Sequence, residues 1–219
     1  SVDKSIAKQF QKPKLVRWKL DTLTGFATIS NDSLYEHLHS FKVPLKPFLG
    51  CIGIAPLNKK NEILSFFQGS FGGNLDYAAV TQSATIYLPV LHDGAYLYIG
   101  DGHALQGDGE IAGNALETSL NVSFTTKLIK KDSLQVLFPR IEDSAYIITL
   151  GIAKNLDDAL KIATAGLLNW LQQDYHLSLQ EAAQVISTAI EYNIPEIADP
   201  EVEVAAKIKK KFLINLKRY

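Results

Sequence analysis

The chain has 219 residues, of which 22 are basic and 23 acidic, and 47% are hydrophobic. This balance lacks the basic excess of a nucleic-acid-binding surface, and no apolar run reaches the roughly 20 residues of a membrane-spanning helix. The single cysteine, Cys51, excludes an internal disulfide and a cysteine-built zinc site. We therefore expect a soluble, cytoplasmic protein with no nucleic-acid or membrane partner.

Strand signals dominate from Lys14 to about Arg140, where short apolar or alternating runs are cut by Gly, Pro, Asn and Asp. The clearest runs are LVRWKLD, TGFATIS, CIGIAPL, ATIYLPV, AYLYIG, SLNVSFTTKLI and SLQVLFPR. Between two of them, His92, Asp93 and Gly94 predict a hairpin turn. We interpret residues 1–142 as a β-rich domain.

The composition changes at about Asp143. After one more strand, AYIITLG, apolar residues recur at helical spacing behind Asn155, which predicts an N-cap. Ser178 and Glu181 form the pattern of a capping box before a second helix. The segment EVEVAAKIKKKFLI alternates like a closing strand. Residues 143–219 are thus predicted as an α+β portion, and the fold as mainly β, of sandwich or barrel type, with that portion at the C-terminus.

The stretch GDGHALQGDGE, residues 100–110, concentrates ionisable side chains that are set off by glycines. Its ionisable residues are Asp101, His103, Asp108 and Glu110, and its glycines are Gly100, Gly102, Gly107 and Gly109. If residues 96–102 and 109–117 pair as antiparallel strands, His103 faces Asp108 and Asp101 faces Glu110 on one face of the hairpin. An acid pair of this kind needs a cation, an imidazolium or a proton between its members. The alternative is a solvated, turn-rich loop.

A second polar cluster lies upstream in QGSFGGNLD. If its last residues are extended, Asn74 and Asp76 share a face, and the glycine pair before them allows a tight turn. By itself this pattern is also typical of an ordinary Gly-Gly-Asn turn.

Taken together, GCIGIAP, GGNLD, YLPV, GDGHALQGDGE and GNALE resemble, in order and spacing, the acetamidase/formamidase family of amide hydrolases. The resemblance implies a mainly β fold, hydrolysis of short linear amides such as formamide or acetamide, a bound divalent metal and a homo-oligomer. Carried over by motif, the site positions are Asn74, Asp76, Asp101, His103, Gln106, Asp108, Glu110 and Glu117.

On this resemblance we assign Asp76, Asp101 and His103 to the metal. Histidine and carboxylate ligands suit zinc foremost, with manganese or iron as alternatives, and a site dominated by carboxylates would suit calcium. Glu117 is the acid that closes the G-x-A-x-E element.

The remaining motif residues receive roles around that metal. Glu110 is assigned as the general base and Asp108 as the partner that orients His103 or completes the coordination. Gln106 and Asn74 can donate and accept hydrogen bonds, so they are assigned to the substrate amide.

The chain departs from the family pattern in two ways. Leu75 replaces a common methionine, a volume-conserving change. Family members also carry a longer N-terminal segment, so the resemblance implies that this chain is an incomplete enzyme, a processed half or the partner of a separate N-terminal piece of the same protein. Two alternatives to acetamide hydrolysis stay open: a calcium-stabilised β-sandwich that binds a ligand without chemistry, and an amidase of the same family that acts on a larger amide or imide.

Overall fold

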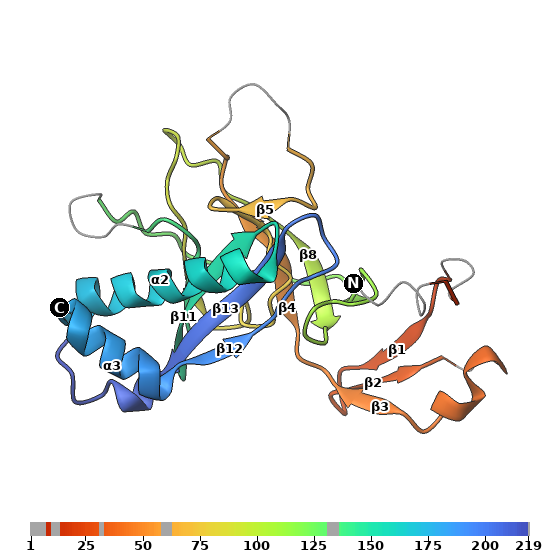
Figure 1. Cartoon of the computed structure of the whole chain (residues 1–219). Helices are drawn as coiled ribbons and strands as arrows, with labels where there is room; N and C mark the ends of the chain where they lie inside the picture. The colour runs from red at the N-terminus through yellow and green to blue at the C-terminus, as the bar shows by residue number, and fades with distance from the viewer. Residues whose placement is uncertain (1–7, 10–13, 31–32, 58–62, 131–135, 219) are drawn as a thin grey trace.

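The computed structural model describes residues 8–9, 14–30, 33–57, 63–130 and 136–218, and the structural statements below refer to these residues. Strands form three antiparallel sheets, and two α-helices lie in the C-terminal part (Figure 1). This arrangement confirms the predicted mainly β fold with an α+β C-terminal portion. Neither α-helix combines the length and the apolar composition needed to cross a bilayer.

The three sheets differ in size. The first has the order β1-β2-β3, with Trp18–Asp21, Phe26–Ile29 and Lys42–Pro44, and a 3-10 helix, η1 (Ser33–Leu38), precedes its last strand. The second has the order β12-β13-β11-β10-β7, with Glu191–Asn193, Val202–Lys209, Tyr146–Ala153, Arg140–Glu142 and Thr85–Tyr87. The third has the order β5-β6-β4-β8-β9, with Gln68–Gly69, Gly72–Asn74, Phe48–Gly53, Tyr98–Leu105 and Leu116–Glu117.

Both predicted helices form, each with the predicted cap. In α2 (Leu156–Tyr175), the Asn155 side chain accepts a hydrogen bond from the Asp158 amide at 2.9 Å. In α3 (Leu179–Ala189), Ser178 and Glu181 exchange both hydrogen bonds of a capping box. These caps satisfy backbone amides that have no partner inside the helix. A short 3-10 helix, η2 (Lys210–Phe212), follows the last strand.

The second sheet is the central layer of the molecule and is covered on both faces. Helix α2 packs Ala163 and Leu167 against one face, where they join the cluster that includes residues of β11 and β13 (Figure 1). On the opposite face, Ile148 and Leu150 of β11 pack with Leu75, which is fully buried. Because Leu75 directly precedes Asp76, this core fixes the chain at the edge of the polar cluster described below.

Three expectations about local structure need correction. Strands β7 and β8, on either side of His92, belong to different sheets, so residues 92–94 form a turn and no hairpin. Residues 119–129 form no strand, because no described strand lies beside them to complete the backbone ladder. In SLQVLFPR, residues 133–135 lie outside the described part, and the strand begins only at Arg140.

The predicted boundary between residues 142 and 143 falls inside the second sheet. Strands β7 and β10 precede that boundary and pair with each other, and β10 also pairs with β11 from beyond it. Strands from both predicted domains therefore share one sheet, and the division into two domains stays a prediction.

Candidate active site

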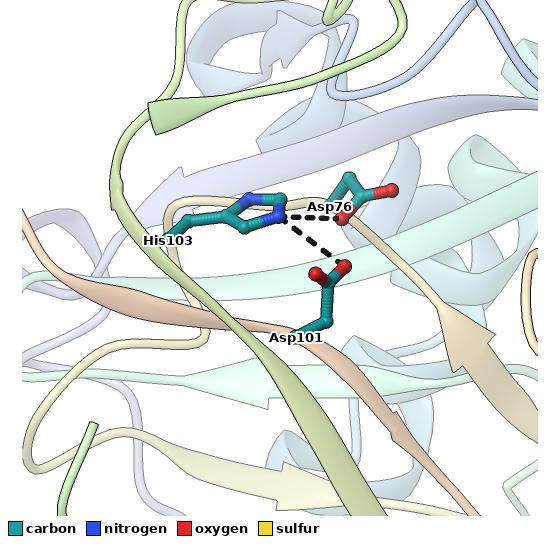
Figure 2. A group of neighbouring side chains, drawn as sticks. All are labelled: Asp76, Asp101 and His103. Atoms are coloured by element: carbon teal, nitrogen blue, oxygen red, sulfur yellow. Dashed lines mark ion pairs between the residues drawn. The ribbon is translucent and has the colours of Figure 1, made fainter. Parts of the chain in front are cut away.

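Three segments bring acidic side chains around His103. Asp101 and His103 belong to β8, Asp76 follows β6, and Glu117 lies on β9. The Nε2 atom of His103 lies 3.2 Å from Asp101 Oδ2, 3.5 Å from Glu117 Oε2 and 3.7 Å from Asp76 Oδ1. Figure 2 shows the imidazole pointing at the two aspartates. The structure thus brings together the three residues that were assigned to a metal.

The predicted hairpin within GDGHALQGDGE is wrong. His103 pairs with Glu117 and Leu105 with Leu116, with an irregularity between these pairs, so His103 does not face Asp108. Gly109 instead forms a parallel bridge with Glu196. Positive φ angles at Gly109 (84°) and Glu110 (42°) turn the chain at this point, and pairing with β8 occurs only further along, at β9.

The backbone is strained at three carboxylates of the cluster. Asp76, Asp101 and Glu110 have φ angles of 42°, 59° and 42°, a region that residues other than glycine rarely occupy. Such positions cost on the order of 1–3 kcal/mol each and persist where the surrounding structure enforces them, often at functional sites. Their coincidence in one cluster is an observation that favours function over an ordinary turn.

Gln106 fixes the orientation and the tautomer of His103. Its Nε2 donates to the carbonyl oxygens of Asp76, at 2.5 Å, and Pro195, at 3.2 Å, so its Oε1 is the atom that faces His103 Nδ1 at 2.9 Å. An oxygen acceptor there requires a proton on Nδ1. The Nε2 atom of His103 therefore presents to the carboxylates either a second proton or a lone pair.

The acids around His103 determine its protonation without a metal. Burial lowers its pKa, but the hydrogen bond and charge of Asp101 and the charges of Glu117 and Asp76 outweigh burial and leave the pKa above its ordinary value. The hydrogen bond from His103 in turn lowers the pKa of Asp101. In a metal-free protein, the surrounding acids thus favour the protonated form of His103.

The same geometry fits a divalent metal. A ligating histidine usually donates its other ring N–H to an oxygen acceptor, as His103 does to Gln106. One ligand atom from each of Asp76, Asp101 and His103 lies within 4.8 Å of the others. Asp76 Oδ1 is buried and has no hydrogen-bond partner among the described residues, so an electron pair is available there.

A second buried group extends the cluster from Asp76. One carboxylate oxygen each of Asp76, Glu110 and Glu196 lies within 4.8 Å of the others. Burial, the hydrogen bond with Glu196 and the charge of Asp76 raise the pKa of Glu110 to about 10. Burial also raises the pKa of Asp76 to about 7.

Glu196 is a site residue that the sequence reasoning missed. It lies in the loop after β12, 86 positions beyond Glu110, and its side chain is fully buried. It belongs to none of the motifs, and as one of 23 acidic residues it carries no local signal. The bridge between Gly109 and Glu196, together with a hydrogen bond from the Glu203 amide to the Glu196 carbonyl, brings it to the cluster.

Asp108 is the acid of the motif that the structure leaves outside. Its carboxylate is exposed and accepts a hydrogen bond from Asn193 at 3.2 Å. The position beside His103 Nδ1 is occupied by Gln106. The expectation that Asp108 orients His103 is therefore corrected, since Gln106 makes that contact.

A hollow of about 430 Å³ opens beside the cluster. It is lined by Cys51, Ser65, Phe66, Asn74, Tyr98, Ile99, Gly100 and Asp101. Within it, Asn74 Nδ2 donates to Asp76 Oδ2 at 2.5 Å and to Asp199 Oδ2 at 3.1 Å. Asn74 thus connects the hollow with the acidic cluster, whereas both ends of the Gln106 amide already have protein partners.

Comparison with known proteins agrees with these motifs. The model of the acetamidase/formamidase family matches residues 68–192. An acetamidase structure from Yersinia enterocolitica is 31% identical with a TM-score of 0.75, and the match covers 90% of this chain and 55% of the relative. An acetamidase structure from Bacillus halodurans is 28% identical with a TM-score of 0.69, and the match covers 86% of this chain and 60% of the relative.

A curated Schizosaccharomyces pombe protein, provisionally named a formamidase, is 40% identical over 60 residues, which are 27% of this chain and 15% of that protein. This chain therefore spans only part of the length of its relatives, about half to three fifths of the two solved acetamidases. The matched family region nevertheless covers more than half of the chain and includes Asp76, Asp101, His103 and Glu110. The chain belongs to the acetamidase/formamidase family.

Proposed function

We propose that this chain hydrolyses short linear amides, such as formamide or acetamide, to the carboxylate and ammonia, with a divalent cation at His103. The observation that carries the proposal is the contact between Gln106 Oε1 and His103 Nδ1. It leaves His103 Nε2 aimed at Asp76 and Asp101, the arrangement of a histidine prepared for a metal. The solved relatives named acetamidases support the substrate class.

The cation would be held by Asp76, Asp101 and His103, with zinc as the first candidate and calcium, manganese or iron as alternatives. When bound, it supplies Lewis-acid polarisation of a carbonyl oxygen and lowers the pKa of water to near 7. Glu117, 3.5 Å from His103 Nε2, is the nearest further carboxylate.

Glu110 is proposed as the general base that takes a proton from the attacking water and returns it to the leaving nitrogen. A pKa of about 10 means that Glu110 is protonated at neutral pH when no cation is near. Positive charge bound in the cluster restores the carboxylate, because it favours the ionised form of nearby acids. The proposed base is therefore competent only when the cluster is loaded.

Asn74 is proposed to bind the substrate amide from the hollow. Both of its described hydrogen bonds use Nδ2 as the donor, which leaves Oδ1 to accept an N–H of the substrate. Gln106 is proposed to orient His103 and not to bind the substrate, since its amide has protein partners at both ends.

The direct test is ammonia release from formamide and acetamide by the metal-loaded chain, with and without chelator. Turnover that the chelator abolishes supports the proposal, and Glu110→Gln should remove turnover while a cation stays at His103. Asp108→Asn should retain turnover, because this exposed carboxylate lies outside the cluster. If folded, loaded protein releases no ammonia, the result favours the alternative of a binding module for small ligands.

A larger amide is the second candidate substrate. The apolar side chains of Phe66, Tyr98 and Ile99 line the hollow, and acetamide offers only a methyl group to them. A panel from acetamide to amides with longer or cyclic acyl groups distinguishes the candidates through kcat/KM. A homo-oligomer, a cytoplasmic location and a separate N-terminal partner stay predictions of the sequence, to be tested on the same preparation.

A further inference from the structure

The buried acids that meet around Asp76 carry more negative charge than their surroundings balance. Asp76 and Glu196 are 1% and 0% exposed, and one oxygen of each lies within 4.8 Å of an oxygen of Glu110. Glu203 of β13, also 0% exposed, lies near enough to Asp76 and Glu196 for their charges to act on it. Four carboxyl groups thus meet in the protein interior.

Positively charged partners are scarce at this point. Among the described residues, the ion pairs of lysine and arginine go to other acids, and only His103 pairs with a member of this group, Asp76. Buried like charges of this kind require bound protons or a cation between them.

The oxygens themselves show where a proton or a cation would bind. Glu196 Oε1 accepts the backbone amides of Ala198 and Asp199, which fixes the carboxylate in its loop. Its second oxygen, Oε2, is buried and receives no hydrogen bond from an amide, hydroxyl, lysine or arginine donor among the described residues, and the same holds for Asp76 Oδ1. The Glu110 carboxyl is the group within reach of both residues. In the ion-free protein a proton of Glu110 can bridge to these carboxylates, and a bound cation would replace that proton between the same oxygens.

We propose that Asp76, Glu110 and Glu196 form a second cation site, which takes a hard divalent ion such as Ca²⁺, Mn²⁺ or Mg²⁺ and shares Asp76 with the site at His103. All three residues offer oxygen only, which favours hard ions, whereas the imidazole of the first site favours zinc. Glu110 keeps one carboxylate oxygen for proton transfer while the other binds the ion. Only the use of this ion in catalysis rests on the proposed function. The existence of the site does not depend on it, so the test does not require turnover.

The test is the stoichiometry of cation binding. The full chain is stripped with chelator, dialysed against Zn²⁺ together with Ca²⁺, Mn²⁺ or Mg²⁺, and analysed by elemental mass spectrometry. We expect two ions per chain in the wild type, with loss of the hard ion in Glu196→Gln and loss of zinc in Asp101→Asn. Glu203→Gln, a matched buried change outside the three ligands, should keep both ions.

Thermal unfolding gives an independent readout. The hard ion should raise the midpoint of the wild type and of Glu203→Gln by several degrees and leave the midpoint of Glu196→Gln unchanged. A wild type that saturates with one ion overturns the proposal, whatever the fate of the variants. The proposal is equally overturned if Glu196→Gln still binds both ions. It is also overturned if no hard ion binds and the substitution Glu196→Gln by itself stabilises the ion-free chain, because protons would then neutralise the group. Two bound ions without ammonia release would refute the proposed function and leave this site intact.

Discussion

The backbone of β4 passes so close to the cluster that Gly50 cannot carry a side chain. A Cβ atom at this position would lie 2.5 Å from Asp76 Oδ1, 2.6 Å from Asp101 Oδ2 and 2.9 Å from His103 Cε1. Ordinary van der Waals contact begins at 3.4 Å, so the tightest of these contacts is short by 0.9 Å. Gly50→Ala therefore forces apart the three proposed ligands of the first cation.

The expected losses follow from that displacement. A misplacement of roughly 1 Å in a catalytic site costs about 100-fold in rate, and overpacking destabilises a fold by about 1–3 kcal/mol. We expect Gly50→Ala to weaken zinc affinity at least about tenfold, because the ligands can no longer close on one ion. Its free energy of unfolding, measured in urea, should fall by about 1–3 kcal/mol.

The assay is competitive zinc titration against a chromophoric chelator, with Gly100→Ala as the matched control. Gly100 lies on β8 directly opposite Cys51 of β4, yet a Cβ there would meet no atom within 4 Å. The control should bind zinc as the wild type does. Equal zinc affinity in Gly50→Ala and the wild type would refute the assignment of these side chains to the metal.

Three further predictions concern other parts of the structure. Burial would raise the pKa of Glu142, but hydrogen bonds from Arg218 and Lys210 lower it to about 2. This depressed pKa contributes stability above the ordinary value near 4.5, and the contribution is lost as pH falls through about 2. After allowance for solvent screening, Glu142→Gln should cost about 1–2 kcal/mol at pH 7 in urea unfolding, and a cost that persists at pH 2 would contradict this. Ser178→Ala should cost about 1 kcal/mol through loss of the helix cap, measured by thermal unfolding, and a neutral result would show that the capping box is dispensable. Gln106→Ala should lower zinc affinity about 10- to 100-fold while the fold persists, and unchanged affinity would remove its proposed role in orienting the imidazole.

Much of the secondary structure was predictable because its signals are local. The Asn155 cap and the capping box of Ser178 and Glu181 depend on hydrogen bonds that reach three residues along the chain. The strands at residues 146–153 and 202–209 follow from alternating or continuous apolar runs. The segment at 119–129 has the same pattern without becoming a strand, since a strand also needs a neighbour that no local pattern supplies.

The residue types of the site were also visible in the sequence, but their arrangement was not. GDGHALQGDGE and GGNLD predicted Asp76, Asp101 and His103 as a group, and the structure places these side chains together. The predicted register failed because the positive φ at Glu110 ends the pairing, and Asp108 consequently faces outward.

The sequence by itself determined the capped helices, the β-rich first part and the two motifs, since each depends on residues a few positions apart. Only the tertiary structure decided which acids share the interior, because Glu196 reaches Glu110 through a bridge across 86 positions and Gln106 displaces Asp108 from His103. Burial then changes what these groups can do. Carboxylates that would be ordinary solvated acids in a turn become, once desolvated beside one another, groups that must bind protons or cations.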